Sequence, residues 1–191
     1  IMPVKVLNSR AFGLYSGIIQ GITWAVDNGA DVINISFGGP RSRSLEEAVN
    51  YAISNNVLIV AAAGNENSSI SFPAAYNGVL SVGATNYNKE RAEYSNYGTQ
   101  LDVVAPGGDT SDDVNNDGQP DGVVQQTLKE TFWGIVNTRE FDYVPFSGTS
   151  MSVPHVSGIA SLLISAGVTD IEEVGDIIIN SATDLGAPGW D

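Results

Sequence analysis

The sequence predicts an α/β domain with a doubly wound, mostly parallel sheet and helices on both faces. Short apolar runs without polar alternation recur along the chain, as expected of strands that are buried on both sides. Segments with helical patterning lie between and after these runs, and strands that alternate with helices favour a parallel sheet. An apolar fraction of 42% over 191 residues is enough for one well-buried domain.

The predicted strands are the apolar runs at residues 4–7, 32–36, 57–62, 79–84 and 101–105. The predicted helices, each bounded by a capping residue or a glycine, cover residues 16–28, 44–55, 149–166 and 171–181. Ser44 and Glu47 occupy capping-box positions in the second helix, and Thr169 and Glu172 do so before the fourth. The third helix is closed by Gly167.

The carboxyl ends of the predicted strands carry the candidate functional residues. Ligands of doubly wound sheets bind beyond these strand ends. Ser36 ends one predicted strand, Gly64 and Asn65 follow another, and Ser150 lies at the start of a predicted helix. We therefore expect these residues to form a single site.

Ser150 lies where a serine can act as a nucleophile. Gly148 permits a sharp exit from the preceding strand, and Ser150 lies in the first turn of the following helix. The unpaired N–H groups and the positive dipole end of that helix favour developing negative charge. Taken alone, such a tripeptide is also typical of a simple helix cap.

The segments around these residues resemble the subtilisin-like serine peptidases, or subtilases. Residues 146–158 resemble the family's nucleophile segment, with the order Gly-Thr-Ser-Met-small-x-Pro-His-Val-x-Gly. Residues 57–66 resemble the strand that ends at the family's oxyanion-hole asparagine. Residues 31–40 resemble the strand and turn at the primary specificity pocket, and residues 4–13 resemble a strand and an edge segment that pairs with bound peptide.

The resemblance implies a serine endopeptidase that acts on polypeptide substrates. Ser150 would attack the peptide carbonyl to form an acyl-enzyme, and the Asn65 amide with the Ser150 N–H would stabilise the oxyanion. Without the resemblance, Asn65 after Gly64 is typical of a turn. Substrate contacts are expected from Ala11, Phe12, Gly13, Ser36, Phe37, Gly38, Ala62, Ala63 and Gly64. The small residues at the two strand ends suit an apolar or aromatic P1 side chain.

The general base is not evident in this chain. His155 is its only histidine, and it lies five residues after Ser150 on the same predicted helix. At ~100° per residue the two side chains diverge by ~140°, so His155 does not reach Ser150. In the subtilase motif this histidine is likewise not catalytic, and we expect a buried, hydrogen-bonded helix residue.

Residues 1–191 are interpreted as a partial peptidase catalytic domain, truncated at both ends. In subtilases the triad runs in the order Asp, His, Ser, which places both partners of Ser150 upstream. No Asp-Thr-Gly or His-Gly-Thr-His segment occurs here. We expect little activity from the chain alone, and we expect the N-terminal part of the catalytic domain to be its partner. The alternative is a non-catalytic, calcium-stabilised binding module with a protease-like groove.

An acidic loop insertion at about residues 107–123 interrupts the α/β pattern. Five carboxylates lie between Asp109 and Asp121, and alternate oxygen-bearing residues before Gly118 resemble the first half of an EF-hand loop. Val124 stands where the bidentate glutamate would be, so a shorter loop is expected. Its predicted calcium ligands are Asp113, Asn115, Asp117, the Gln119 carbonyl and Asp121. The alternative is a solvated acidic turn.

Composition excludes several other classes of function. A net charge of −14 disfavours nucleic-acid and anionic-membrane partners. No apolar run approaches the ~20 residues needed to cross a bilayer, so membrane insertion is not expected. The chain has no cysteine and therefore neither disulfides nor thiol catalysis. It shows no signal-peptide pattern, and a secreted or extracellular location is implied by the family resemblance alone.

Overall fold

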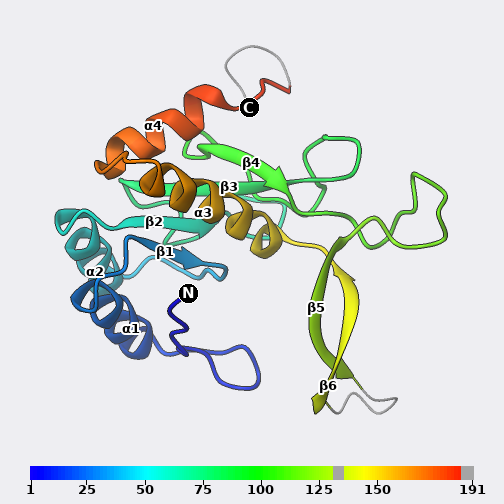
Figure 1. Ribbon diagram of the computed structural model, residues 1–191, viewed down its shortest axis with the longest axis horizontal. Helices are drawn as coiled ribbons and strands as arrows, with labels where there is room; N and C mark the ends of the chain where they lie inside the picture. Colours follow the sequence, from blue (N-terminus) through cyan, green and yellow to red (C-terminus); the bar gives the residue numbers. More distant parts are fainter. Residues whose placement is uncertain (131–135, 186–191) are drawn as a thin grey trace.

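A computed structural model describes residues 1–130 and 136–185. Its central sheet has four parallel strands in the order β1 (Val32–Ile35), β2 (Leu58–Ala62), β3 (Val79–Thr85) and β4 (Val103–Pro106). The helices are α1 (Tyr15–Asp27), α2 (Arg43–Ser54), α3 (Thr149–Ser165) and α4 (Ile171–Ser181). The predicted fold class is confirmed, because helices cover both faces of a parallel sheet (Figure 1).

Two apolar clusters, one on each face, form the core. Ile59 and Ala61 of β2 pack with α1 and α2, whereas Leu58 and Val60 pack with α3 and α4. All five residues of β2 are buried, which explains why this strand reads as an unbroken apolar run. The same packing fixes α3 across the sheet and places its first turn at the carboxyl ends of the strands (Figure 1).

The predicted strand at residues 4–7 is wrong. These residues have no regular secondary structure, although Val6 packs against the core. Its side chain lies on α1, where a Cβ added to Gly21 would be 2.5 Å from Val6 Cγ1. The physical reason is that apolar side chains can be buried without ladder hydrogen bonds, and only such bonds make a strand. Among the described residues, β1 therefore pairs only with β2.

Two predicted helix caps are also wrong by one or two residues. α2 begins at Arg43 because Ser42, not Ser44, is extended and accepts a hydrogen bond from the Leu45 N–H. α4 is capped by Asp170 rather than Thr169, since Asp170 Oδ1 accepts from the Glu172 N–H at 2.9 Å. Neighbouring polar residues compete for a cap, and the backbone conformation decides between them.

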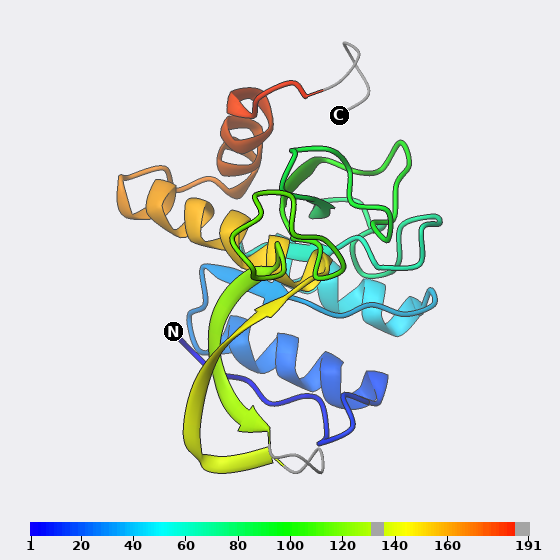
Figure 2. The same ribbon diagram turned by 90° about the vertical axis from the view of Figure 1, so that its right-hand side faces the viewer.

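A long antiparallel hairpin is not predicted by the sequence patterns. β5 (Val123–Glu130) pairs with β6 (Val136–Phe146), and these two strands form a sheet of their own. The hairpin projects from the layered body in Figure 1, and Figure 2, viewed from that side, shows it in front of the body. β6 leads directly into the turn that carries Ser150. None of the described helices is both long and apolar enough for a membrane span.

Candidate active site

The turn that carries Ser150 is fixed to the end of β1. Gly148 has φ 148°, a conformation that favours glycine, and α3 begins at the next residue. Ser150 Oγ donates to the Ser36 carbonyl oxygen at 2.8 Å, and Ser36 Oγ donates to the Ser150 carbonyl oxygen at 3.0 Å. This reciprocal pair places the Ser150 hydroxyl beside the strand end that the sequence assigns to the specificity pocket.

Asn65 lies against the same turn. Its Oδ1 accepts from the Thr149 N–H and from Thr149 Oγ1, both at 2.9 Å. Thr149 is fully buried, and its Oγ1 also accepts from the Gly64 N–H at 3.3 Å. Since two donors hold Oδ1, the Asn65 Nδ2 group is turned toward Gly148, where an added Cβ would be 3.4 Å from it. Within the described part of the chain, no acceptor pairs with Nδ2, which leaves a donor free beside the nucleophile turn.

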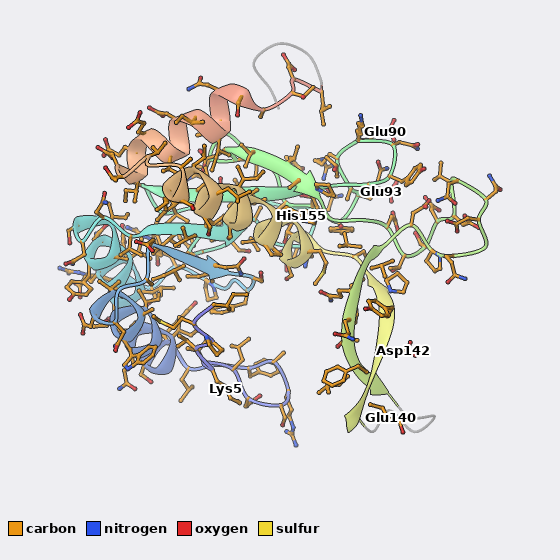
Figure 3. All side chains as sticks on the ribbon, viewed as in Figure 1. Lys5, Glu90, Glu93, Glu140, Asp142 and His155 are labelled. Carbon is orange, nitrogen blue, oxygen red and sulfur yellow. The ribbon has the colours of Figure 1, made fainter. Side chains whose placement is uncertain are left out.

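His155 takes no part in this arrangement. Its Nδ1 lies 2.8 Å from the Met151 carbonyl oxygen, one helical turn earlier. Figure 3 labels His155 on α3. The expected hydrogen bond is present, but the expected burial is wrong, since His155 is exposed. Position 155 lies on the flank of α3 that the sheet does not cover, whereas Val153 and Val156 face the core.

The two predicted pocket walls lie at the ends of β1 and β2. Ala62 and Ala63 are buried, and Gly64 has φ 112°. A Cβ added to Gly38 would lie 2.9 Å from Ser71 Cβ, so the first wall packs closely on the segment after Ile70. Gly39 and Phe72 exchange backbone hydrogen bonds of 2.9 and 3.0 Å, which fix this packing.

Residues 11–13 are not an open edge in this structure. The Phe12 carbonyl accepts from the Asn8 N–H at 2.8 Å, and the Phe12 N–H donates to Asn8 Oδ1 at 3.2 Å. Ala11 has φ 58°, so the segment forms a turn that closes on Asn8. The Phe12 side chain is exposed. Pairing with a peptide would require this turn to open.

The acidic loop folds around its own backbone amides. Asp113 accepts from the Asp117 and Gly118 N–H groups at 3.1 and 3.0 Å. Asn115 Oδ1 accepts from the Asp117 N–H at 2.8 Å, and Asp117 Oδ1 from the Gln119 N–H at 2.8 Å. Asp121 accepts from the Val114 N–H. The predicted ligand residues are thus gathered in one turn, but no cluster of three or more Asp, Glu or His in the described ranges has metal-binding geometry.

Tyr94 connects this loop to the nucleophile turn, and sequence reasoning missed it. Its hydroxyl accepts from the Gly148 N–H at 3.0 Å and donates to the Gly108 carbonyl at 2.8 Å. The Gly148 N–H also donates to the Gly107 carbonyl at 3.0 Å. Burial raises the pKa of Tyr94 to about 12, with a smaller rise from the Asp109 charge and an opposing effect of the Gly148 bond. No motif marks a tyrosine 54 residues before Gly148.

Tyr94→Phe is expected to lower the free energy of unfolding by about 1 kcal/mol, the typical net value of one hydrogen bond. For a chain of this size the midpoint of thermal unfolding falls by roughly 2–4 °C. Because the folded-state pKa lies above the ordinary value of 10, the neutral hydroxyl contributes stability below pH ~10 that is lost as the pH rises toward 12. Circular dichroism melts measure both effects. Tyr87→Phe, at an exposed tyrosine, is the control, and an equal loss there would contradict the role of Tyr94.

The described geometry defines an α/β protein with a serine-bearing helix start and a free amide donor at the carboxyl edge of a parallel sheet. The profile of the subtilase family matches residues 1–191, so the chain belongs to that family. It is 40% identical to subtilisin DY of Bacillus licheniformis over 97% of this chain and 62% of the relative. It is 41% identical to subtilisin BL of Lederbergia lenta over 98% of this chain and 62% of the relative. The chain thus spans about three-fifths of these relatives.

Solved structures agree with this assignment. A protease from Pseudoalteromonas arctica matches with a TM-score of 0.81 and 35% identity, over 93% of this chain and 54% of that structure. A cold-adapted subtilisin-like serine proteinase matches with a TM-score of 0.77 and 27% identity, over 97% of this chain and 61% of that structure.

Proposed function

We propose that this chain carries the nucleophile and the oxyanion donors of a subtilisin-like serine endopeptidase. The observation that supports this most directly is the contact between Asn65 and Thr149, which holds a free amide donor next to Ser150. In the proposed reaction Ser150 Oγ attacks a peptide carbonyl, and its proton passes to a base. The oxyanion accepts hydrogen bonds from Asn65 Nδ2 and the Ser150 N–H. The base then protonates the leaving amine, and water hydrolyses the acyl-enzyme.

The base must come from polypeptide outside residues 1–191. In the structure the Ser150 proton is donated to the Ser36 carbonyl, which cannot take it up as a base. A neutral imidazole on the open side of Ser150 would replace that acceptor and raise the nucleophilicity of the oxygen. We propose that the segment carrying the catalytic aspartate and histidine supplies it, as the family relationship implies.

The unpaired edge of β1 is the proposed docking place for that segment. A groove of about 810 Å³ runs between β1, α1 and α3, and its walls are mostly apolar. It is lined by residues that include Val4, Val6, Val32, Ile33 and Pro154. A strand added at this edge would pair the free backbone groups of β1 and cover the apolar walls. Solving the structure of the longer protein tests this placement directly.

The proposed substrates are polypeptides with an apolar or aromatic P1 residue. Apart from Phe37, the walls at residues 36–38 and 62–64 carry only small side chains or backbone, and they offer no charged group to a substrate side chain. Comparison of kcat/KM for peptide substrates that differ only at P1 tests the preference. A higher value for a charged P1 residue would contradict it.

A fluorophosphonate probe separates the peptidase from its rival, a calcium-stabilised binding module without catalysis. The longer protein should be labelled rapidly at Ser150, whereas residues 1–191 alone should react slowly because no base is present. Peptide binding without labelling or hydrolysis by the longer protein would support the binding module. We also propose an extracellular location from the subtilisin relatives, which fractionation of cells and medium tests.

We propose that calcium binds the acidic loop and stabilises the fold. The support is the spacing of Asp113, Asn115, Asp117 and Asp121 and their convergence on one turn. A cation would replace the backbone N–H groups as partner of the carboxylates and remove their mutual repulsion. The Gln119 carbonyl oxygen would complete the ligand set.

Calcium at ~100 times its dissociation constant is expected to add about 2.7 kcal/mol to the free energy of unfolding. That gain corresponds to a rise of roughly 5–10 °C in the unfolding midpoint of this chain. Asp117→Ala should remove most of the rise, whereas Asp176→Ala, on α4 and far along the chain from the loop, should keep it. Melting curves with calcium and with chelator provide the measurement. If the unmodified chain unfolds at the same midpoint with calcium and with chelator, the loop is a solvated acidic turn that does not bind calcium.

A further inference from the structure

Asn96 is a fully buried polar residue beside the loop that carries Asn65. The segment from Tyr94 to Tyr97 runs along residues 64–68 and is tied to them by backbone hydrogen bonds. The Asn96 N–H donates to the Gly64 carbonyl at 3.0 Å, and the Tyr97 N–H donates to the Ser68 carbonyl at 3.0 Å. Asn65 itself is exposed at the surface of the site, so the loop depends on this inner layer for its shape.

The Asn96 amide uses its full hydrogen-bonding capacity on this loop. Nδ2 donates to the Ala63 carbonyl at 3.0 Å and to Glu66 Oε2 at 2.8 Å. Oδ1 accepts from the Glu66 and Ser68 N–H groups, both at 3.0 Å. An amide has two donor hydrogens and two acceptor lone pairs, and all four are satisfied here. These partners bracket Asn65 on both sides.

Glu66 carries the effect of Asn96 to Asn65. The Glu66 carboxylate oxygen that accepts from Asn96 also accepts from the Asn65 backbone N–H at 3.0 Å. Gly64 completes the packing, because a Cβ at that position would lie 2.2 Å from Asn96 Nδ2. Asn96 makes no hydrogen bond to the Asn65 side chain within the described residues, so its effect on the reaction is indirect.

We infer that Asn96 is a positioning residue for the oxyanion-binding amide of Asn65, an inference that rests on the proposed peptidase function. Its side-chain amide fixes residues 63, 66 and 68, and its backbone N–H fixes residue 64, and together they fix where Asn65 Nδ2 lies relative to Ser150. A misplacement of about 1 Å at a site of this kind costs up to about 10²-fold in rate. Loss of the Asn96 donors should therefore lower kcat and leave KM nearly unchanged.

The test uses the full-length protein with Asn96→Asp, which keeps the side-chain shape but removes both N–H donors. We expect a 10- to 100-fold lower kcat with KM within about threefold of the unmodified value. Ser81→Ala is the matched control, because Ser81 is also fully buried and hydrogen-bonded, yet it contacts Gln100 and Asp102 instead of the loop. A comparable loss of kcat in Ser81→Ala would overturn the inference.

Two combined variants test whether Asn96 affects kcat through Glu66 and Asn65. In an Asn65→Ala background, Asn96→Asp should change kcat by less than about threefold, since coupled residues are not additive. Glu66→Gln added to Asn96→Asp reverses the polarity of the side-chain pair. The amide introduced at position 66 can then donate to the carboxylate introduced at position 96, and part of kcat should be recovered. Full additivity in the first case, or no recovery in the second, would contradict the inferred route.

Hydrogen exchange separates this inference from the proposed function. The backbone amides of Asn65, Glu66 and Ser68 should exchange faster in Asn96→Asp than in the unmodified protein and in Ser81→Ala. Unchanged exchange at these amides would overturn the positioning role whether or not the protein is a peptidase. Absence of both hydrolysis and fluorophosphonate labelling in the unmodified full-length protein would instead overturn the proposed function, and the exchange measurement would still decide the role of Asn96.

Discussion

Ser150→Ala is expected to abolish peptide hydrolysis in a form of the protein that includes the catalytic aspartate and histidine. The expected loss in kcat is about 10⁶-fold, a magnitude that comes from the nucleophile of a subtilisin, a relative of this chain. The physical reason is that no other group can form the acyl-enzyme, so only oxyanion stabilisation and binding remain. Steady-state hydrolysis of a chromogenic peptide measures the loss.

The control for this prediction is Ser165→Ala, which removes an exposed serine from the last turn of the same helix and should leave kcat unchanged. KM of Ser150→Ala should stay close to that of the unmodified protein, because within the pocket wall the hydroxyl contacts only the Ser36 backbone carbonyl and no side chain. Hydrolysis that persists at more than about a hundredth of the original rate would show that a different residue is the nucleophile.

Asn65→Ala is expected to lower kcat by roughly 10²–10³-fold with little change in KM, a range that again comes from a subtilisin asparagine. The Asn65 amide donates its strongest hydrogen bond when the carbonyl oxygen carries the negative charge of the transition state. Loss of the amide therefore raises the activation barrier and leaves substrate binding nearly unchanged. The Asn65→Asp variant tests the donor role of this amide more strictly. It keeps the acceptor for Thr149 but replaces the donor with a negative charge, so its activity should be no higher than that of Asn65→Ala.

Ser69→Ala, an exposed position in the same loop, should have no effect on kcat and serves as the matched control. The variants should be compared at a temperature well below their unfolding midpoints, so that differences in kcat report on the folded state. A rise in KM with unchanged kcat in Asn65→Ala would mean that the amide binds substrate and transition state equally. That result would reject its assignment to the oxyanion site.

Local sequence patterns are enough to predict most of the fold. The strands β1 to β4 and all four helices of the described structure are expected from apolar runs and helical periodicity. This success follows from burial on both faces, since a strand such as β2 must be apolar at every position. The segment at residues 4–7, Val-Lys-Val-Leu, is also largely apolar but lacks a hydrogen-bonded strand neighbour among the described residues. Pairing is a property of two segments, and the composition of one does not reveal it.

The hairpin of β5 and β6 is not expected from the sequence, because it has no short turn signal and follows an acidic stretch. The helix caps at Ser42 and Asp170 are missed for a related reason. Each cap depends on which of two nearby polar residues takes the extended conformation, a choice made by the packing of the chain before the helix.

For the candidate site, the sequence alone determined the type of residue at each strand end and helix start. The sequence predicts Ser150 after a glycine turn and Asn65 after a buried strand as site residues, because local conformation and motif coincide there. Only the tertiary structure decided how these groups are held. The hydrogen bonds join residues far apart in the sequence: Asn65 and Thr149 are 84 residues apart, Ser36 and Ser150 are 114 apart, and Asn96 and Glu66 are 30 apart. Such contacts depend on strand order, on register and on the placement of α3 across the sheet, which no local pattern encodes.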